Sequence, residues 1–156
     1  IVMNDKTKRR RVLAVASGGG HWVQLLRLRP AFEGCAVTYA TVQPSYAAQV
    51  PGERFHSFTD ATRWSRWDLV TMVLEVCWIV IRTRPDVIVS TGAAPGVVAL
   101  RLGKLLGART VWLDSIANVE TMSMSGRKVR KFADLWLTQW PAVASSEGCT
   151  FKGAVL

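Results

Sequence analysis

The sequence predicts an α/β fold of the Rossmann type, with a mainly parallel sheet and helices on both of its faces. Short apolar runs alternate with segments of helical periodicity, as in parallel strands joined by helices. The runs are rich in valine, isoleucine and leucine throughout, which favours strands covered on both faces. We therefore expect a single Rossmann-like domain over residues 11–156, preceded by a basic tail over residues 1–10.

The strands are identified by these apolar runs and by the residues that interrupt them. The first strand is expected over residues 11–17, because three consecutive glycines follow it. A short helix over residues 21–28 comes next and ends before Pro30. The same pattern predicts further strands at residues 37–42, 54–58, 86–90, 110–113, 135–138 and 150–155.

Three more helices are expected between the later strands. The most apolar covers residues 68–82, with Asp68 as its N-cap. Another covers residues 97–106, where Pro95 fits the first helical position and Gly107 stops the helix. A basic helix over residues 127–133 completes the set.

Composition restricts the class of protein. The chain has 156 residues, of which 49% are hydrophobic, and this excludes an intrinsically disordered chain. Its three cysteines are an odd, widely spaced set, so we expect reduced thiols and neither a disulfide framework nor a zinc site. No metal and no cofactor is predicted. The formal net charge of +9 indicates anionic partners, such as a phosphorylated ligand, an anionic membrane face or nucleic acid.

Two observations bear on the location of the protein. The apolar stretch after the basic residues 6–11 is too short for a secretory signal, which favours the cytosolic side. The longest apolar segment, residues 69–81, would span about 20 Å as a helix, short of a bilayer core of about 30 Å. No conventional transmembrane helix is therefore expected.

Small and polar residues gather where the predicted strands end. The carboxyl ends of parallel strands share one edge of a sheet, and ligands of such folds bind beyond that edge. Four segments are expected there: residues 17–21, 43–46, 91–96 and 114–118.

Two glycine turns at this edge are candidate sites for a phosphate or a diphosphate. Glycines let the backbone approach a ligand closely, and a helix N-terminus offers unpaired N–H groups to an anion. A tight turn without a ligand is the alternative for each. The residues concerned are Ser17, Gly18, Gly19 and Gly20 in the first turn, and Thr91 and Gly92 in the second.

Two other nucleotide sites fit the first turn less well. A dinucleotide fingerprint would need glycine or alanine where Val23 stands and an acid near residues 41–43, where there is none. A P-loop is excluded because no Gly-Lys-Ser/Thr follows.

His21 and Asp114 are the candidate catalytic residues. His21 opens a helix beside the glycines, and imidazole is suited to remove a proton from an attacking hydroxyl. A histidine that only binds the loop is an equal alternative, and His56 is expected to be structural. Asp114 ends a strand at the same edge, where an acid either acts on a ligand or caps the next segment. Asn118 lies in the same segment and is a further candidate contact for the diphosphate.

The apolar helix over residues 68–82 carries tryptophans and has arginines at its ends. This composition favours a membrane interface with anionic lipid, while a core or subunit-facing helix is the alternative. Nucleic acid is not an expected partner, because the basic run 127–131 has no aromatic stacking platform beside it. The candidate membrane or partner contacts are Arg63, Trp64, Arg66, Trp67, Trp78 and Arg82.

A series of motifs in fixed order carries a resemblance to a known family. The motifs lie at residues 16–21 and 24–26, then 90–93, and most specifically at 114–117, 122–127, 133–134, 138–141 and 153–156. Together they resemble the bacterial polysaccharide-biosynthesis family of PssD and CpsF. That family is similar to the membrane-anchor subunit of the eukaryotic dolichol-linked UDP-N-acetylglucosamine transferase.

The resemblance implies the N-terminal half of a GT-B glycosyltransferase that is split into two chains. This half would bind a polyprenyl-diphosphate-linked saccharide at the cytoplasmic face of the inner membrane, in exopolysaccharide or capsule biosynthesis. A separate small catalytic subunit would bind the UDP-sugar. In related single-chain enzymes of the MurG type the glycine turn faces the acceptor diphosphate, and His21 matches a candidate base.

The chain also departs from the family pattern. Asp114 stands where the family usually has glutamate, which keeps an acid but shortens its reach, and Asn118 replaces a frequent arginine. Two other functions are kept beside the leading one. The first is a non-catalytic membrane scaffold that recruits the catalytic subunit, and the second is a nucleotide-dependent Rossmann enzyme.

Overall fold

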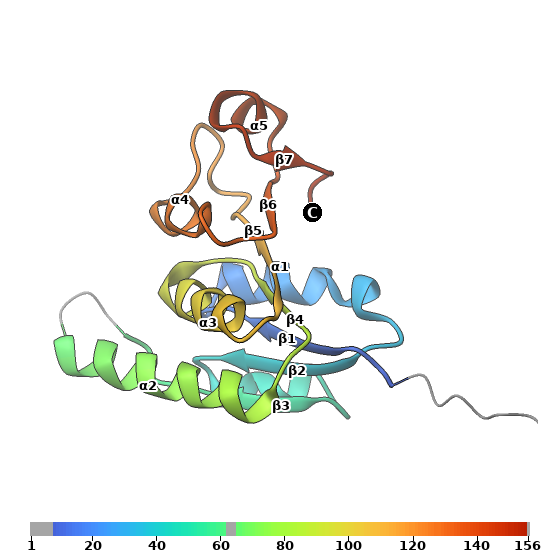
Figure 1. Cartoon of the computed structure of the whole chain (residues 1–156), viewed down its shortest axis with the longest axis vertical. Helices are drawn as coiled ribbons and strands as arrows, with labels where there is room; N and C mark the ends of the chain where they lie inside the picture. Colours follow the sequence, from blue (N-terminus) through green and yellow to red (C-terminus); the bar gives the residue numbers. More distant parts are fainter. Residues whose placement is uncertain (1–7, 62–64, 156) are drawn as a thin grey trace, which may run out of the picture.

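Seven parallel strands form one sheet in the order β3-β2-β1-β4-β5-β6-β7 (Figure 1). The computed structural model describes residues 8–61 and 65–155. This arrangement confirms the predicted Rossmann-like sheet. The strands are β1 (Arg11–Val15), β2 (Ala36–Thr41), β3 (Arg54–Ser57), β4 (Val87–Ser90), β5 (Arg109–Leu113), β6 (Leu135–Thr138) and β7 (Thr150–Phe151).

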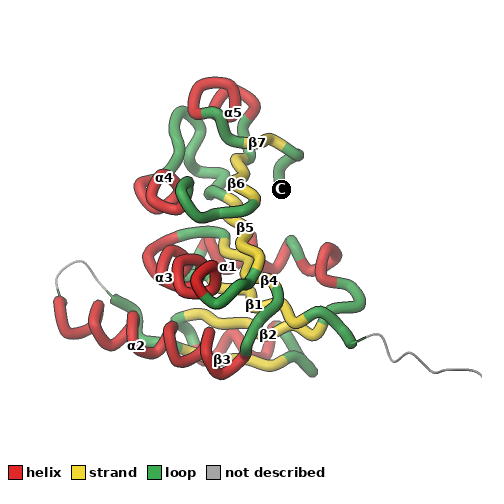
Figure 2. The backbone as a smooth tube through the Cα atoms, in the orientation of Figure 1, coloured by secondary structure: helices red, strands yellow, loops and turns green. Residues whose placement is uncertain are grey.

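Helices cover both faces of the sheet, as expected. One apolar core lies under the long helices α2 and α3, around Ile88 and Trp112, and the other lies under α1, around Trp22 and Tyr39. Figure 2 shows α4 and α5 beside β6 and β7, at the end of the molecule away from β3. The helices are α1 (Gly20–Arg27), α2 (Arg66–Thr83), α3 (Ala93–Leu105), α4 (Met124–Val129) and α5 (Pro141–Glu147), with 3₁₀ turns η1 (Arg29–Phe32) and η2 (Pro44–Gln49).

Two predicted helix starts were wrong. The N-cap of α2 is Ser65, whose hydroxyl accepts a hydrogen bond from the Asp68 N–H at 3.2 Å, so Asp68 lies in the first turn instead. Helix α3 begins at Ala93, earlier than predicted, and Pro95 occupies its third position. Proline is tolerated there because the first N–H groups of a helix have no intrahelical partner.

The C-terminal part differs most from the expectation. The basic helix is α4, which begins and ends earlier than predicted because Ser123 caps it through the Gly126 N–H at 2.9 Å. The predicted last strand is only the two-residue β7. Helix α5 was missed, although Pro141 at its start and Gly148 in the left-handed conformation at its end are ordinary helix boundaries.

Helix α3 lies unusually close to the sheet. An added Cβ at Gly96 would come within 2.0 Å of the Ser90 hydroxyl, and one at Gly103 within 2.2 Å of the Ile88 side chain. These two glycines therefore let the helix pack against β4. The close packing fixes where the N-terminus of α3 meets the carboxyl edge of the sheet.

Candidate functional site

The candidate site lies where β1 and β4 run side by side. The strand order reverses at this point, because β2 and β3 extend the sheet on one side of β1 and β4 extends it on the other. Such a switch point leaves a crevice beyond the carboxyl ends of the two strands. Both predicted glycine turns follow these strands, and each leads into a helix, α1 or α3.

Reciprocal hydrogen bonds join the two turns. The His21 ring binds the Thr91 carbonyl through Nδ1 at 3.0 Å, and the buried Thr91 hydroxyl donates to the His21 carbonyl at 2.6 Å. The ring lies against Gly92, where an added Cβ would come within 2.4 Å of it. Only glycine fits at position 92, so the sequence of the second turn fixes the place of the histidine in the first.

The bond to Thr91 also selects the state of the His21 ring. A carbonyl oxygen can only accept, so Nδ1 must carry the proton in this hydrogen bond. In the neutral ring Nε2 is then an unprotonated acceptor. The side chain is half-buried, and the described residues provide no hydrogen-bond partner for Nε2. An imidazole with one nitrogen anchored and the other available is chemically able to accept a proton from a ligand.

The N-termini of α1 and α3 are open to an anion. Their N-cap residues, Gly19 and Gly92, make no side-chain capping bond, and neither first turn contains an acidic residue. Among the other helices, α2 and α4 are capped by Ser65 and Ser123, whereas α5 also lacks a side-chain cap. Unpaired N–H groups and the positive end of the helix dipole attract a phosphate.

The remaining residues of the first turn line the same edge. Ser17 and Gly18 are half-buried, while Gly19 and Gly20 are exposed. The Ser17 carbonyl accepts a hydrogen bond from the Thr41 hydroxyl at 3.3 Å, which holds the turn on β2. These four residues lead directly into His21, at the start of α1.

The structure does not support the catalytic role expected for Asp114. Its side chain is 1% exposed and accepts hydrogen bonds from Trp112 Nε1 at 3.1 Å and Asn118 Nδ2 at 3.0 Å. It also accepts from Ser123, through the backbone N–H at 2.8 Å and the hydroxyl at 2.5 Å. Both oxygens are thus occupied in holding the segment from residue 115 to 123 against β5.

Asn118 is drawn into the same cluster. Its amide nitrogen donates to Asp114, so in this structure that group is not directed at a ligand. The expected contact of Asn118 with the acceptor diphosphate therefore receives no support from the geometry.

A buried pair of glutamines links the turns to the rest of the edge. Gln24 Oε1 accepts from Gln139 Nε2 at 2.6 Å and from the Ile116 N–H at 3.1 Å. Gln139 Oε1 accepts from the Val155 N–H at 2.9 Å. The pair fixes α1 to the ends of β5 and β6. Sequence reasoning missed this role, although Gln24 and Gln139 both lie in the motifs that carry the family resemblance.

The predicted edge segment at residues 43–46 supports α1 from the β2 side. Tyr46 stacks on Trp22 with ring centroids 5.2 Å apart, and Trp22 Nε1 donates to Gln49 Oε1 at 2.9 Å. This segment therefore positions α1, and the turns at residues 17–21 and 91–96 form the candidate site.

Helix α2 exposes a second apolar face. On its inner face Met72, Val76 and Ile79 are buried, while an outer stripe of exposed apolar side chains runs along the whole helix. Arg66 and Arg82 are exposed near its ends, whereas the predicted contacts Arg63 and Trp64 lie outside the described residues. Within the described parts of the chain, no helix is long and apolar enough to cross a membrane. The outer stripe of α2 consists of Trp67, Val70, Leu74, Trp78 and Ile81.

His56 lies beside this helix, away from the glycine turns. Its ring meets Trp78 edge-on with centroids 5.7 Å apart. Burial, together with the positive charge of Arg54, lowers the pKa of His56. The neutral ring packs against α2, in line with the structural role expected for this residue.

A family model for oligosaccharide biosynthesis proteins like Alg14 matches residues 48–155. This chain belongs to the Alg14-like family. Its relatives include the UDP-N-acetylglucosamine transferase subunit ALG14 of Eremothecium gossypii. That protein is 27% identical over 86% of this chain and 75% of its own length. The mouse subunit of the same name is 26% identical over 85% of this chain and 76% of its own length.

Two solved structures illustrate the likeness in fold. The first is MurG of Acinetobacter baumannii, with a TM-score of 0.68 and 12% identity over 86% of this chain. The second is a UDP-N-acetylglucosamine 2-epimerase from Rickettsia bellii, with a TM-score of 0.69 and 12% identity over 95% of this chain. The Alg14-like chain spans 43% and 46% of these two proteins. The likeness shows the fold.

These comparisons support part of the resemblance inferred from the motifs. The similarity to the eukaryotic transferase subunit is confirmed. The narrower relation to the bacterial PssD and CpsF proteins is not shown by them and stays a prediction.

Asp114→Asn should test the structural role of this side chain. An amide nitrogen would face the Ser123 donors, so we expect the free energy of unfolding to fall by about 2–3 kcal/mol. Asn118→Ala, which removes one donor to Asp114, should destabilise less, and Glu120→Gln at an exposed position of the same segment should have no effect. Denaturant unfolding measures all three. Unchanged stability of Asp114→Asn would restore the catalytic interpretation.

Proposed function

We propose that this chain is the acceptor-binding, membrane-associated half of a two-chain inverting glycosyltransferase. It transfers a sugar from a UDP-sugar to a polyprenyl-diphosphate-linked saccharide, in exopolysaccharide or capsule biosynthesis. The names of the relatives, as subunits of a UDP-N-acetylglucosamine transferase, support this assignment. The observation that carries it is His21 held between two uncapped helix N-termini at the switch point of the sheet.

The acceptor diphosphate binds between the two turns. N–H groups of residues 18–20 and 93–94 donate to its oxygens, since no side chain caps α1 or α3. Each helix N-terminus adds about half a positive charge, so the pair suits a doubly charged group. A helix end that bears glycine leaves room for the phosphorus atoms to approach the backbone.

His21 acts as the general base. Its Nε2 accepts the proton of the acceptor hydroxyl as that oxygen attacks the anomeric carbon of the donor sugar. The bond from that carbon to the UDP oxygen breaks, UDP leaves with the electron pair, and the anomeric configuration inverts. The Thr91 carbonyl keeps the ring in place and stabilises the imidazolium that forms, because Nδ1–H remains its donor.

Asp114 and Asn118 have no chemical step in this proposal. They keep the segment after β5 at the rim, where it contacts Gln24 of α1 through Ser115 and Ile116. The acid that the sequence suggested as a second catalytic group is a positioning residue.

A small catalytic subunit brings the UDP-sugar. The relatives are named as subunits of a UDP-N-acetylglucosamine transferase, which supports a division of the site between two polypeptides. The active cleft forms when the second subunit covers the turns at residues 17–21 and 91–96.

The outer stripe of α2 lies on the cytoplasmic face of the inner membrane. Trp67 is 83% exposed and Leu74 65% exposed, and neither has a function in a surface that faces only water. Arg66 and Arg82 add attraction for anionic lipid heads, and the net charge of +9 acts in the same direction. An amphiphilic surface of this kind holds the protein beside a lipid-linked acceptor.

Replacing His21 tests the base. With the small subunit reconstituted, His21→Ala should lower the rate of sugar transfer at least about 100-fold, the usual range for a lost general base. Val23→Ala, at an exposed position of the same helix, is the control and should leave the rate unchanged. Full activity of His21→Ala would establish the scaffold function instead. A rise in melting temperature with NAD or S-adenosyl methionine would favour a nucleotide-dependent Rossmann enzyme.

Vesicle binding tests the α2 stripe. Trp67→Ser combined with Leu74→Ser should abolish sedimentation with vesicles rich in anionic lipid, because both remove exposed apolar area. Met124→Ser, at a 70% exposed residue of α4, should bind as the unchanged protein does. Binding should weaken as salt screens the arginines. Equal binding of the double variant would remove α2 from the membrane contact.

A further inference from the structure

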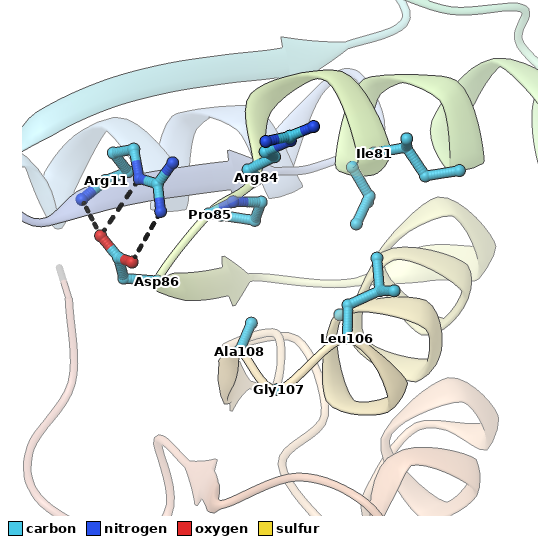
Figure 3. A pocket seen from close by; sticks show the side chains of 10 residues that line it. Arg11, Ile81, Arg84, Pro85, Asp86, Leu106, Gly107 and Ala108 are labelled. Atoms are coloured by element: carbon cyan, nitrogen blue, oxygen red, sulfur yellow. Dashed lines mark hydrogen bonds and ion pairs between the residues drawn. The ribbon is translucent and has the colours of Figure 1, made fainter.

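A cavity of about 680 Å³ opens at the edge of the sheet opposite the glycine turns (Figure 3). It lies where α2 and α3 end and where β1 and β4 begin. Its size is typical of ligand sites, which range over about 300–1,000 Å³. The lining combines an apolar wall, formed by Val80, Ile81, Leu106 and Ala108, with the charged residues Arg11, Arg84 and Asp86.

The apolar wall continues the outer stripe of α2. Ile81 is the last residue of that stripe and is 57% exposed, and Leu106 lies across the opening from it and is 59% exposed (Figure 3). Leu105, which is 67% exposed, adjoins Leu106 without lining the cavity. A bilayer that meets the α2 stripe would therefore also meet the mouth of this cavity.

Arg84 gives the lining its net positive charge. Arg11 and Asp86 neutralise each other, with Arg11 Nη2 3.0 Å from Asp86 Oδ1 and the Arg11 backbone N–H bonded to Oδ2 at 2.8 Å. This pairing keeps the pKa of the Asp86 carboxyl low. The exposed side chain of Arg84 makes no ion pair with any described residue. One cation is thus available at the mouth.

The helix ends beside the cavity oppose an anion only weakly. Arg84 is the C-cap of α2 in the left-handed conformation, with φ of 45°, and its N–H closes the helix on the Val80 carbonyl at 3.1 Å. At the end of α3 the Ala108 N–H binds the Gly103 carbonyl at 2.8 Å. These bonds satisfy carbonyls that would otherwise face the cavity with partial negative charge.

We propose that this cavity binds one anionic phospholipid of the bilayer. An acyl chain lies between Ile81 and Leu106, and the lipid phosphate pairs with Arg84. A soluble phosphate would leave the apolar wall without a partner, and an uncharged hydrocarbon would leave Arg84 without one, so an anionic amphiphile fits both parts of the lining. The inference rests on the membrane association proposed above and adds a site for an individual lipid.

The test uses a lipid that needs no bilayer. Dihexanoylphosphatidylglycerol, kept below its critical micelle concentration, is titrated into the whole chain and followed by amide NMR shifts or calorimetry. We expect saturable binding with shifts around Arg84 and Leu106. Arg84→Gln, which removes the cation, and Leu106→Trp, which fills the mouth, should each weaken binding about tenfold, the loss expected for one charge-assisted hydrogen bond or one filled subsite.

Two matched variants control for charge and for apolar area. Arg109→Gln removes an exposed cation next to Ala108, and Leu105→Trp enlarges the exposed side chain next to Leu106, but neither Arg109 nor Leu105 lines the cavity. Both should keep the original affinity. Equal losses in the controls, no saturation, or equal binding of inorganic phosphate or hexanoate would overturn the proposed lipid site.

The outcome separates this site from the proposed function. If vesicle binding depends on Trp67 and Leu74 while the short-chain lipid does not bind, membrane association stands and the lipid site falls. If the short-chain lipid binds and His21→Ala retains full transfer activity, the lipid site stands and the catalytic proposal falls.

Discussion

The candidate site depends on the paired hydrogen bonds between His21 and Thr91. They join two turns that are 70 residues apart in the sequence. The turns follow β1 and β4, the two neighbouring strands between which the strand order of the sheet reverses. Since the ring of His21 rests directly on Gly92, the second turn determines where the His21 side chain lies. Both helix N-termini and the free imidazole nitrogen follow from this contact. A change that separates the two turns would move the two helix N-termini and the imidazole apart.

Much of the fold was predictable because the strands are buried on both faces and their apolar runs are unbroken. The glycine turns were predictable for a similar reason, since few other residues tolerate their backbone geometry. Ala93 is an exception, because it adopts a φ of 68° at the start of α3 and no residue pattern predicts an alanine in the left-handed conformation. This is one reason why the predicted α3 began too late.

The roles of Asp114, Gln24 and Gln139 were beyond the reach of sequence patterns. An acid at the end of a strand has the same signature whether it faces a ligand or receives donors from a later loop. Its strongest partner, Ser123, is nine residues away, and the two glutamines are 115 residues apart. Only the folded chain shows that these polar groups satisfy one another. Helix α2 is a related case, because its sequence is apolar on two faces and does not say which one packs on the sheet.

An NMR titration with geranyl diphosphate tests whether the two uncapped turns bind a diphosphate. Saturable shifts should be largest for the backbone amides of residues 18–21 and 92–94, together with a shift of the His21 ring. Shifts spread over the basic surface, or confined to other residues, would contradict diphosphate binding at the turns.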